Sequence, residues 1–254
     1  MRHKENSEKD ETGRELSGEI VQGDTEILLQ KQSAQAALEA LAKQWAVSVG
    51  ELPKSWEAIK SRIRIRLVNY AWNKKALENI PHRRYLDLAA VFALEVSESD
   101  HCKIALTIRR GYLLEWGITE EYLWEAAQEN LKEEEYTVRL LSRILKEITG
   151  EKLDQSENDL EAYILTNKEE CYGAAGIFRK DVLESFARET GSSFYILPGT
   201  LHELILLPDR YLVKAGELKE MVREINHTKV KPTERLSGSV YYYDRERGEV
   251  RMVE

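Results

Sequence analysis

The residues best suited to chemistry in this sequence are a histidine and an acid side by side, His202 and Glu203, in the stretch YILPGTLHELILLPDRY. Histidine titrates near neutral pH and acts as a general base or a metal ligand when a partner orients its ring. Neighbouring residues of a strand point to opposite faces, so the pair could act on one atom only from a turn. We predict that PGTLHEL is a hairpin turn with a mainly structural role, in which Pro198 fixes the backbone and Gly199 gives it freedom.

A second concentration of polar residues is NIPHRRYLDL, where His82 and Asp87 precede a long apolar run. Residues just before a buried strand lie at the edge of a sheet, where they can line a cleft. We expect this segment to be a loop whose Arg83 and Arg84 are solvated, because surface charges usually are. The alternative is that the fold brings His82 and Asp87 close to the histidine–glutamate pair in one catalytic or metal site.

The sequence lacks the spacing of familiar metal and cofactor sites. Zinc takes three or four protein ligands, and the five histidines show no HxH or HxxxH pattern. Cys102 and Cys171 form no CxxC pair, which argues against a zinc ribbon or a disulfide framework. The stretch LTNKEECYGAAG lacks GxxxxGKS/T and GxGxxG spacing, so we expect close packing of small residues rather than a phosphate cradle. We therefore predict neither a cofactor nor a metal ion.

Composition limits the classes of partner. The chain has 254 residues and a formal net charge of −8, which argues against a general nucleic-acid binder, although RIRIR could form a local basic patch. No stretch approaches the roughly 18 apolar residues that a membrane span needs. The first residues, MRHKENSEKDETGRELSGE, lack the apolar core of a secretory signal. We expect a reduced, cytoplasmic protein with a protein partner, not a nucleic-acid or membrane partner.

Apolar periodicity predicts the elements of the first half. In SRIRIRLVN, Ile63, Ile65 and Leu67 alternate with arginines, which favours a strand over a helix that would continue from Trp56 and Ile59. The apolar run 86–96 predicts a buried strand, and 103–108 predicts its hairpin partner across SESDH.

Helical spacing predicts three helices in the same region. Thr119 is the expected N-cap of a helix whose acidic first turn suits the positive helix end, and 137–148 is expected to form a second helix. Five apolar residues also recur at helical spacing nearer the N-terminus, namely Ile27, Ala34, Leu38, Leu41 and Trp45.

The second half repeats this order of elements. The expected strands are LEAYILTN, SFYIL and ELILL, and the expected helices are AGELKEMVREIN and RKDVLESFARETG, the latter ending at Gly191. SVYYYD and EVRMV are expected to form a closing hairpin.

These elements predict an α+β fold with two similar halves, each a β-hairpin with flanking helices, around mixed sheets. The expected organisation is a disordered tail over 1–24, an amphipathic helix over 25–50, a first half over 51–150 and a second half over 151–254.

The chain resembles a bacterial family of unknown function, the domain-of-unknown-function 5688 family. The resemblance is carried by RLVNYAWNKKAL, IPHRRYLDLAAVF, YILTN, YGAAGIF, YILPGTLHELILLP, MVREINHTKV and ERLSGSVYYYD, which cover most of residues 60–245. The family tends to have two serines after ILP, where this chain has Gly199 and Thr200, so a serine nucleophile is not expected there. The resemblance implies no particular chemistry.

For function, we expect a non-enzymatic interaction or regulatory protein, because the sequence shows no catalytic spacing and has a polar tail followed by an amphipathic segment that could dock on a partner. The alternative is a hydrolase-like or metal-dependent enzyme with a site around His202, Glu203, His82 and Asp87.

Overall fold

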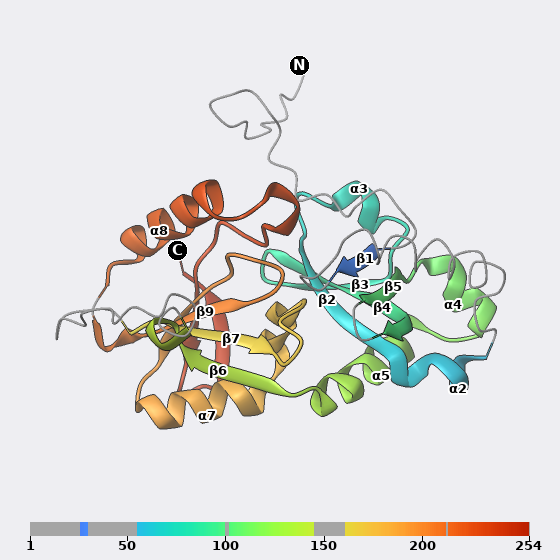
Figure 1. The fold of residues 1–254 in the computed structure, drawn as a ribbon, viewed down its shortest axis with the longest axis horizontal. Coiled ribbons are helices and arrows are strands. Elements are labelled where there is room, and N and C mark those ends of the chain that lie inside the picture. Colours follow the sequence, from blue (N-terminus) through green and yellow to red (C-terminus); the bar gives the residue numbers. More distant parts are fainter. Residues whose placement is uncertain (1–25, 30–54, 100–101, 145–160, 212, 254) are drawn as a thin grey trace, which may run out of the picture.

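The computed structural model describes residues 26–29, 55–99, 102–144, 161–211 and 213–253. These residues form helices and two antiparallel sheets that lie side by side (Figure 1), which confirms the α+β class. The expected tail over 1–24 and most of the expected helix over 25–50 lie outside the described residues. Residues 26–29 form a strand instead of the start of that helix, because they pair antiparallel with a strand of the first sheet.

The first sheet has five strands. Its path runs β1 (Glu26–Leu29), β5 (Cys102–Thr107), β4 (Leu88–Ser99) and β2 (Ile63–Asn69), and β3 (His82–Tyr85) also pairs with β4. The predicted strand of alternating isoleucines and arginines is confirmed as β2, whose Ile63, Ile65 and Leu67 are at most 3% exposed. The predicted buried strand and its hairpin partner are confirmed as β4 and β5, and β4 extends to Ser99, within the expected loop SESDH.

The second sheet has six strands. Their order is β11 (Glu249–Met252), β10 (Tyr241–Asp244), β8 (Phe194–Leu197), β9 (Leu204–Pro208), β7 (Tyr163–Asn167) and β6 (Tyr136–Leu140). Three of the predicted strands, β7, β8 and β9, and the closing hairpin of β10 and β11 are therefore confirmed. The predicted helix over 137–148 is wrong over 137–140, because these residues pair with β7 as β6; only 141–144 of its described part are helical.

The sheets also differ from two further expectations. Every strand pair between the described strands is antiparallel, so the prediction of mixed sheets is wrong. The strand orders of the two sheets are different, and β6 joins the second sheet although it precedes residue 150, the expected end of the first half. The described strand order therefore does not repeat between the halves.

Three longer helices cover the sheets: α5 (Glu120–Glu133), α7 (Lys180–Thr190) and α8 (Ala215–Thr228). All three were predicted, and their end signals are confirmed where we assigned them. The Thr119 hydroxyl accepts a hydrogen bond from the Tyr122 amide, and Gly191 ends α7 with a φ of +73°. The shorter helical segments are α2 (Trp56–Ile59), η1 (Lys60–Arg62), α3 (Lys74–Leu77), α4 (Arg110–Trp116), η2 (Gly173–Phe178), η3 (Asp209–Tyr211) and η4 (Pro232–Glu234).

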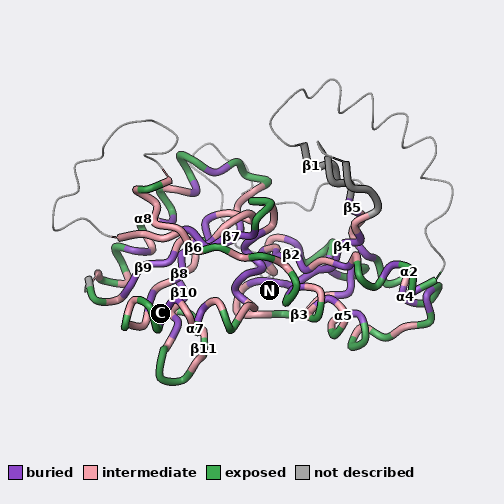
Figure 2. Tube along the Cα trace, turned by 60° about the horizontal axis from the view of Figure 1, so that its bottom comes forward, coloured by how far each residue is buried: buried purple, intermediate pink, exposed green. Residues whose placement is uncertain are grey.

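One hydrophobic core continues from the first sheet into the second (Figure 2). It joins Phe92 of β4 and Leu123 of α5 to Leu165 of β7 and Phe186 of α7. A separate cluster lies beneath α8, where Leu218 packs with residues of β8 and β9. The helices α7 and α8 therefore cover opposite faces of the second sheet, since successive residues of a strand point to opposite faces.

Candidate functional site

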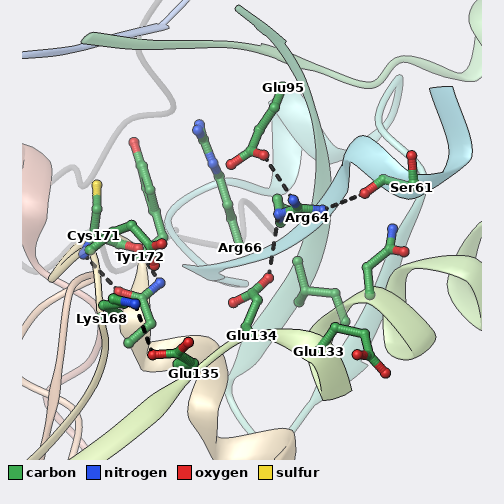
Figure 3. A pocket seen from close by; sticks show the side chains of 14 residues that line it. Ser61, Arg64, Arg66, Glu95, Glu133, Glu134, Glu135, Lys168, Cys171 and Tyr172 are labelled. Atoms are coloured by element: carbon green, nitrogen blue, oxygen red, sulfur yellow. Dashed lines mark hydrogen bonds and ion pairs between the residues drawn. The ribbon is translucent and has the colours of Figure 1, made fainter. Parts of the chain in front are cut away.

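A cavity of about 450 Å³ opens where the two sheets meet (Figure 3). Its walls come from η1, β2 and β4 of the first half, from the C-terminal part of α5 with the connection to β6, and from the segment that follows β7. The lining residues are Ser61, Arg64, Ile65, Arg66, Glu95, Asn130, Glu133, Glu134, Glu135, Asn167, Lys168, Glu169, Cys171 and Tyr172. We refer to this cavity as the cleft. Its volume lies within the range typical of small-molecule sites.

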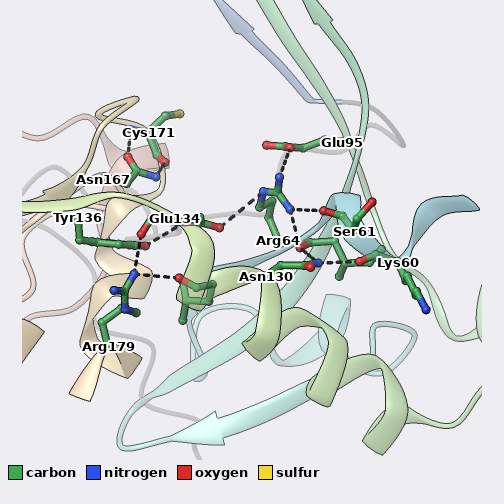
Figure 4. Close-up of polar contacts among 12 residues, drawn as sticks. Lys60, Ser61, Arg64, Glu95, Asn130, Glu134, Tyr136, Asn167, Cys171 and Arg179 are labelled. Carbon is green, nitrogen blue, oxygen red and sulfur yellow. Dashed lines mark hydrogen bonds and ion pairs between the residues drawn. The ribbon is translucent and has the colours of Figure 1, made fainter. Parts of the chain in front are cut away.

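Arg64 is held between two carboxylates in the cleft. Alternation along β2 turns Arg64 away from the core that Ile63 and Ile65 enter. Its guanidinium forms ion pairs with Glu95 at 3.0 Å and with Glu134 at 3.6 Å. One of its nitrogens also donates to the backbone carbonyls of Ser61 and Ile63, at 2.9 and 3.1 Å. These contacts fix the guanidinium in one orientation (Figure 4).

Glu134 is a largely buried acid of the cleft. Burial raises the pKa of its carboxyl from 4.5 to about 7, with Arg64 acting in the opposite direction and Glu95 adding to the rise. The Tyr136 hydroxyl donates to this carboxyl at 3.3 Å. Glu134 therefore changes charge near neutral pH, which is the property expected of a functional acid or base.

The connection that carries Glu134 is anchored by Arg179. Glu134 follows the last residue of α5, and the next strand, β6, belongs to the second sheet. The Arg179 guanidinium donates to the carbonyls of Leu131 and Glu134, at 3.0 and 2.6 Å, and pairs with Asp181 at 2.7 Å. Glu134 thus lies between the two sheets, where its carboxyl contacts Arg64 of β2 and Tyr136 of β6 and its carbonyl is held by Arg179, directly before α7.

The opposite wall of the cleft is a stack of Arg66 on Tyr172. The Arg66 side chain is only 7% exposed, and its guanidinium carbon lies 3.8 Å from the centre of the Tyr172 ring. The Tyr172 amide donates to Nδ1 of His202 at 3.3 Å, and the two rings lie 5.4 Å apart. His202 therefore supports the wall of the cleft through Tyr172, and its Nδ1 acts as an acceptor in this contact.

The segment that bears Tyr172 is closely packed. Asn167 and Cys171 exchange two hydrogen bonds, from the Asn167 amide to the Cys171 carbonyl at 2.8 Å and from the Cys171 N–H to Asn167 Oδ1 at 3.0 Å. A Cβ on Gly173 would lie 2.3 Å from Thr166 Oγ1 and 2.6 Å from the His202 carbonyl oxygen. The prediction that small residues of LTNKEECYGAAG pack closely is confirmed.

His202 and Glu203 lie in the turn between β8 and β9. Their backbone N–H groups both donate to the Thr200 hydroxyl, at 3.1 and 3.2 Å, and the His202 carbonyl accepts from the Thr166 hydroxyl at 2.8 Å. Burial and the nearby Glu170 raise the pKa of the Glu203 carboxyl. These contacts support a structural role for the turn, which stays a prediction.

His82 belongs to β3, so the predicted loop over NIPHRRYLDL is wrong for residues 82–85. The reason is that β4 is long enough to pair with β3 beside β5. Nδ1 of His82 is 2.9 Å from the Ile80 carbonyl oxygen. The adjacent arginines are not simply solvated, because Arg83 forms an ion pair with Glu121 and Arg84 lies over the Tyr70 ring.

Asp87 joins the two halves. Its carboxylate accepts hydrogen bonds from the hydroxyls of Ser237, Ser239 and Tyr241, the first two at 2.6 and 2.9 Å. The amide of Asn69, also in the first half, donates to the Leu236 carbonyl at 3.3 Å. We call these contacts of Asp87 and Asn69 the junction.

The four residues proposed from the sequence lie in separate elements. His202 and Glu203 are in the turn between β8 and β9, His82 is in β3, and Asp87 lies between β3 and β4. Within the ranges that the structure describes, no three histidine, cysteine, aspartate or glutamate side chains are grouped so that they could hold a metal ion.

Glu134 was not predicted from the sequence, and the arginines of β2 were expected on an exposed basic face. Of the supposed basic face, Arg64 is ion-paired and Arg66 is buried against Tyr172. The period-two pattern did place both on one side of the strand. No local spacing relates them to Glu134, which lies 70 residues further along the chain than Arg64.

Comparison with known proteins gives one match. The model of a family of unknown function, DUF5688, matches residues 28–245. No curated protein and no solved structure matches the chain. Within its described part, no helix has the length and apolar character needed to cross a membrane.

Proposed function

We propose that this chain, which belongs to the DUF5688 family of unknown function, is a non-enzymatic regulatory protein that binds a small polar ligand in the cleft. The observation that supports this proposal is the charge kept at the cleft wall. Arg66 is 7% exposed, and Glu134 is buried enough to raise its pKa to about 7. Buried charges are costly unless they are paired, and an apolar wall would be at least as stable. Binding of a polar ligand would explain why charged side chains occupy this wall.

Regulation is supported by the position of the cleft between the sheets. A ligand in it would contact β2 and β4 on one side and the segment after β7 on the other. Its binding free energy would therefore depend on how the two halves are placed, and ligand binding would in turn favour one placement of the halves over others.

A second candidate function is catalysis with Glu134 as general acid–base. One specific observation favours it, the pKa of about 7, which suits proton transfer at neutral pH. Arg64, which pairs with Glu134, would stabilise negative charge on a substrate. The enzyme hypothesis built on His202 and Glu203 with His82 and Asp87 has less support, because the Asp87 carboxylate is engaged by three hydroxyls and the His202 ring accepts from the Tyr172 amide.

Thermal unfolding in the presence of a panel of polar small molecules tests the binding function. A ligand at 100 times its Kd stabilises the folded state by about 2.7 kcal/mol, which raises the Tm of a chain this long by about 5–10 °C. The Arg66→Met variant should lose the shift. Arg251→Met is the matched control, because Arg251 lies over the ring of Tyr242 outside the cleft. A panel without any shift, or a shift that Arg66→Met retains, would contradict the proposal.

Recovery of the bound molecule separates binding from catalysis. If the protein is a regulator, the ligand returns unchanged after long incubation, as seen by NMR. If it is an enzyme, the ligand is converted by the native protein and not by Glu134→Gln, which cannot exchange a proton at neutral pH.

A further inference from the structure

We infer that the ligand of the cleft is a zwitterion, with its anionic group directed inward to Arg64 and Arg66 and its cationic group directed outward to an acidic rim. This inference rests on the proposed function and adds the chemical class of the ligand. It follows from two layers of charge within one cavity.

The inner layer carries the guanidinium groups. Arg66 lies flat against the Tyr172 ring, and Arg64 is held between Glu95 and Glu134 (Figure 3). A guanidinium presents its N–H groups in its own plane, where a planar carboxylate can accept two of them at once. Because Glu95 and two backbone carbonyls already accept from Arg64, an incoming carboxylate would replace Glu134, the more distant of its two acids at 3.6 Å, as a partner of this guanidinium.

The outer layer is acidic. Four exposed residues, Glu133, Glu135, Lys168 and Glu169, form the rim of the cleft on the side of α5 and the β7–η2 segment. Three of them are carboxylates, and the single lysine pairs with Glu135 at 3.0 Å. The rim thus has an excess of negative charge, which attracts an ammonium or guanidinium group and repels a ligand that is only anionic.

The inner layer disfavours a ligand that is only cationic, since its cation would have to approach two arginines. Two arginines face two glutamates there, and the layer gains positive charge when Glu134 takes up a proton. An inward carboxylate should favour that protonated form, so binding should be accompanied by proton uptake near pH 7. A free basic amino acid and the C-terminal residue of a peptide share the required chemistry.

Calorimetric titration of the full chain at pH 7 tests the inference with four probes. L-lysine and glycyl-glycyl-lysine carry both charges, cadaverine lacks the carboxylate, and hexanoate lacks the amines. At least one zwitterion should bind about tenfold or more tightly than cadaverine and hexanoate, a difference of about 1.4 kcal/mol. A preference for lysine identifies a free amino acid, and a preference for the tripeptide identifies a peptide C-terminus. The inference is overturned if neither zwitterion binds, or if cadaverine or hexanoate binds as tightly.

Substitutions in each layer test what that layer contributes to binding of the zwitterion. Glu133→Gln combined with Glu169→Gln should weaken binding of the preferred zwitterion several-fold, and Arg66→Met should abolish it. Glu224→Gln, an exposed carboxylate of α8 outside the cleft, is the matched control and should change nothing. Unchanged affinity in the rim double variant, or proton release on binding, would count against the two-layer arrangement.

Failure of this inference can be distinguished from failure of the proposed function. If a panel ligand that depends on Arg66 proves to carry one kind of charge only, the cleft is a binding site and the ligand class is wrong. If no ligand depends on Arg66, the proposed function itself is wrong.

Discussion

Replacing Glu134 with glutamine should stabilise the protein at neutral and alkaline pH, although it removes one ion pair. Glutamine has the size of the protonated acid and can still accept the hydrogen bond from Tyr136. Arg64 keeps its closer partner, Glu95, at 3.0 Å. What the substitution removes is the cost of holding a charged carboxylate in a buried position.

The magnitude follows from the pKa of the Glu134 carboxyl, which burial raises from 4.5 to about 7. Between these values the folded state binds more protons than the unfolded state, so its stability falls as the pH rises. The loss is complete above pH 7 and amounts to about 3 kcal/mol, at about 1.36 kcal/mol for each pKa unit. Glu134→Gln should avoid this loss and match the native protein only below about pH 4.5.

Urea unfolding followed by tryptophan fluorescence at several pH values between 4.5 and 8 measures the difference. At pH 8 the variant should be more stable by up to about 3 kcal/mol, or about 1 M in the urea midpoint. The matched control is Glu133→Gln, which removes the same charge from the neighbouring exposed position. Its curve should follow that of the native protein across the range.

Two results would refute this reasoning. A variant that is less stable than the native protein at pH 8 would mean that the ion pair with Arg64 outweighs the cost of burial. A stability difference that stays constant between pH 4.5 and 8 would mean that Glu134 does not titrate in this interval.

Three further substitutions test the contacts around the cleft and the junction. Asp87→Asn should destabilise the protein by about 2–4 kcal/mol in urea unfolding, because three hydroxyls lose a charged acceptor. The control is Asp209→Asn, which should cost about 1 kcal/mol because the Asp209 carboxylate accepts one hydroxyl. Equal effects of the two substitutions would argue against the hydrogen-bond network of Asp87. His202→Ala should cost about 1–2 kcal/mol through the lost Tyr172 contact and leave bound metal at background by elemental analysis, whereas loss of stoichiometric zinc would establish a metal site. Gly173→Ala should lower the stability of the protein by about 2–3 kcal/mol, because its Cβ would lie 2.3 Å from a threonine oxygen. The control is Gly216→Ala, whose Cβ has open space and which should raise the stability by up to about 1 kcal/mol. Similar thermal midpoints for the two variants would contradict the close packing around Gly173.

The elements that the sequence predicted correctly carry their signals locally. The α5 helix begins at Thr119 because its hydroxyl caps the first turn, and α7 ends at Gly191, whose φ of +73° suits glycine. The long strand β4 is a continuous apolar run because its residues Leu88 to Leu94 are buried on both faces.

The strands that were missed depend on a partner distant in the sequence. Residues 137–140 have apolar positions that suit either period, and pairing with β7 decides in favour of strand β6. β1 and β3 are four residues long and owe their conformation to pairing with β5 and β4. Pairing of this kind leaves no mark in a short segment.

The site was harder to predict than the fold because its parts come together only in three dimensions. Arg64, Glu95 and Glu134 are far apart in the sequence, and a glutamate within a run of glutamates looks like a solvated one. His202 was singled out because it stands beside an acid, Glu203, between two apolar runs. The structure connects it to the cleft through the amide and the ring of Tyr172.

The most direct test of the central claim is a crystal structure determined after soaking with the polar panel. We expect a panel molecule bound in the cleft between Arg66 and Glu134, in contact with residues of both sheets. A panel molecule bound at another place while the cleft holds only water, or a cleft that stays filled with water throughout the panel, would contradict it.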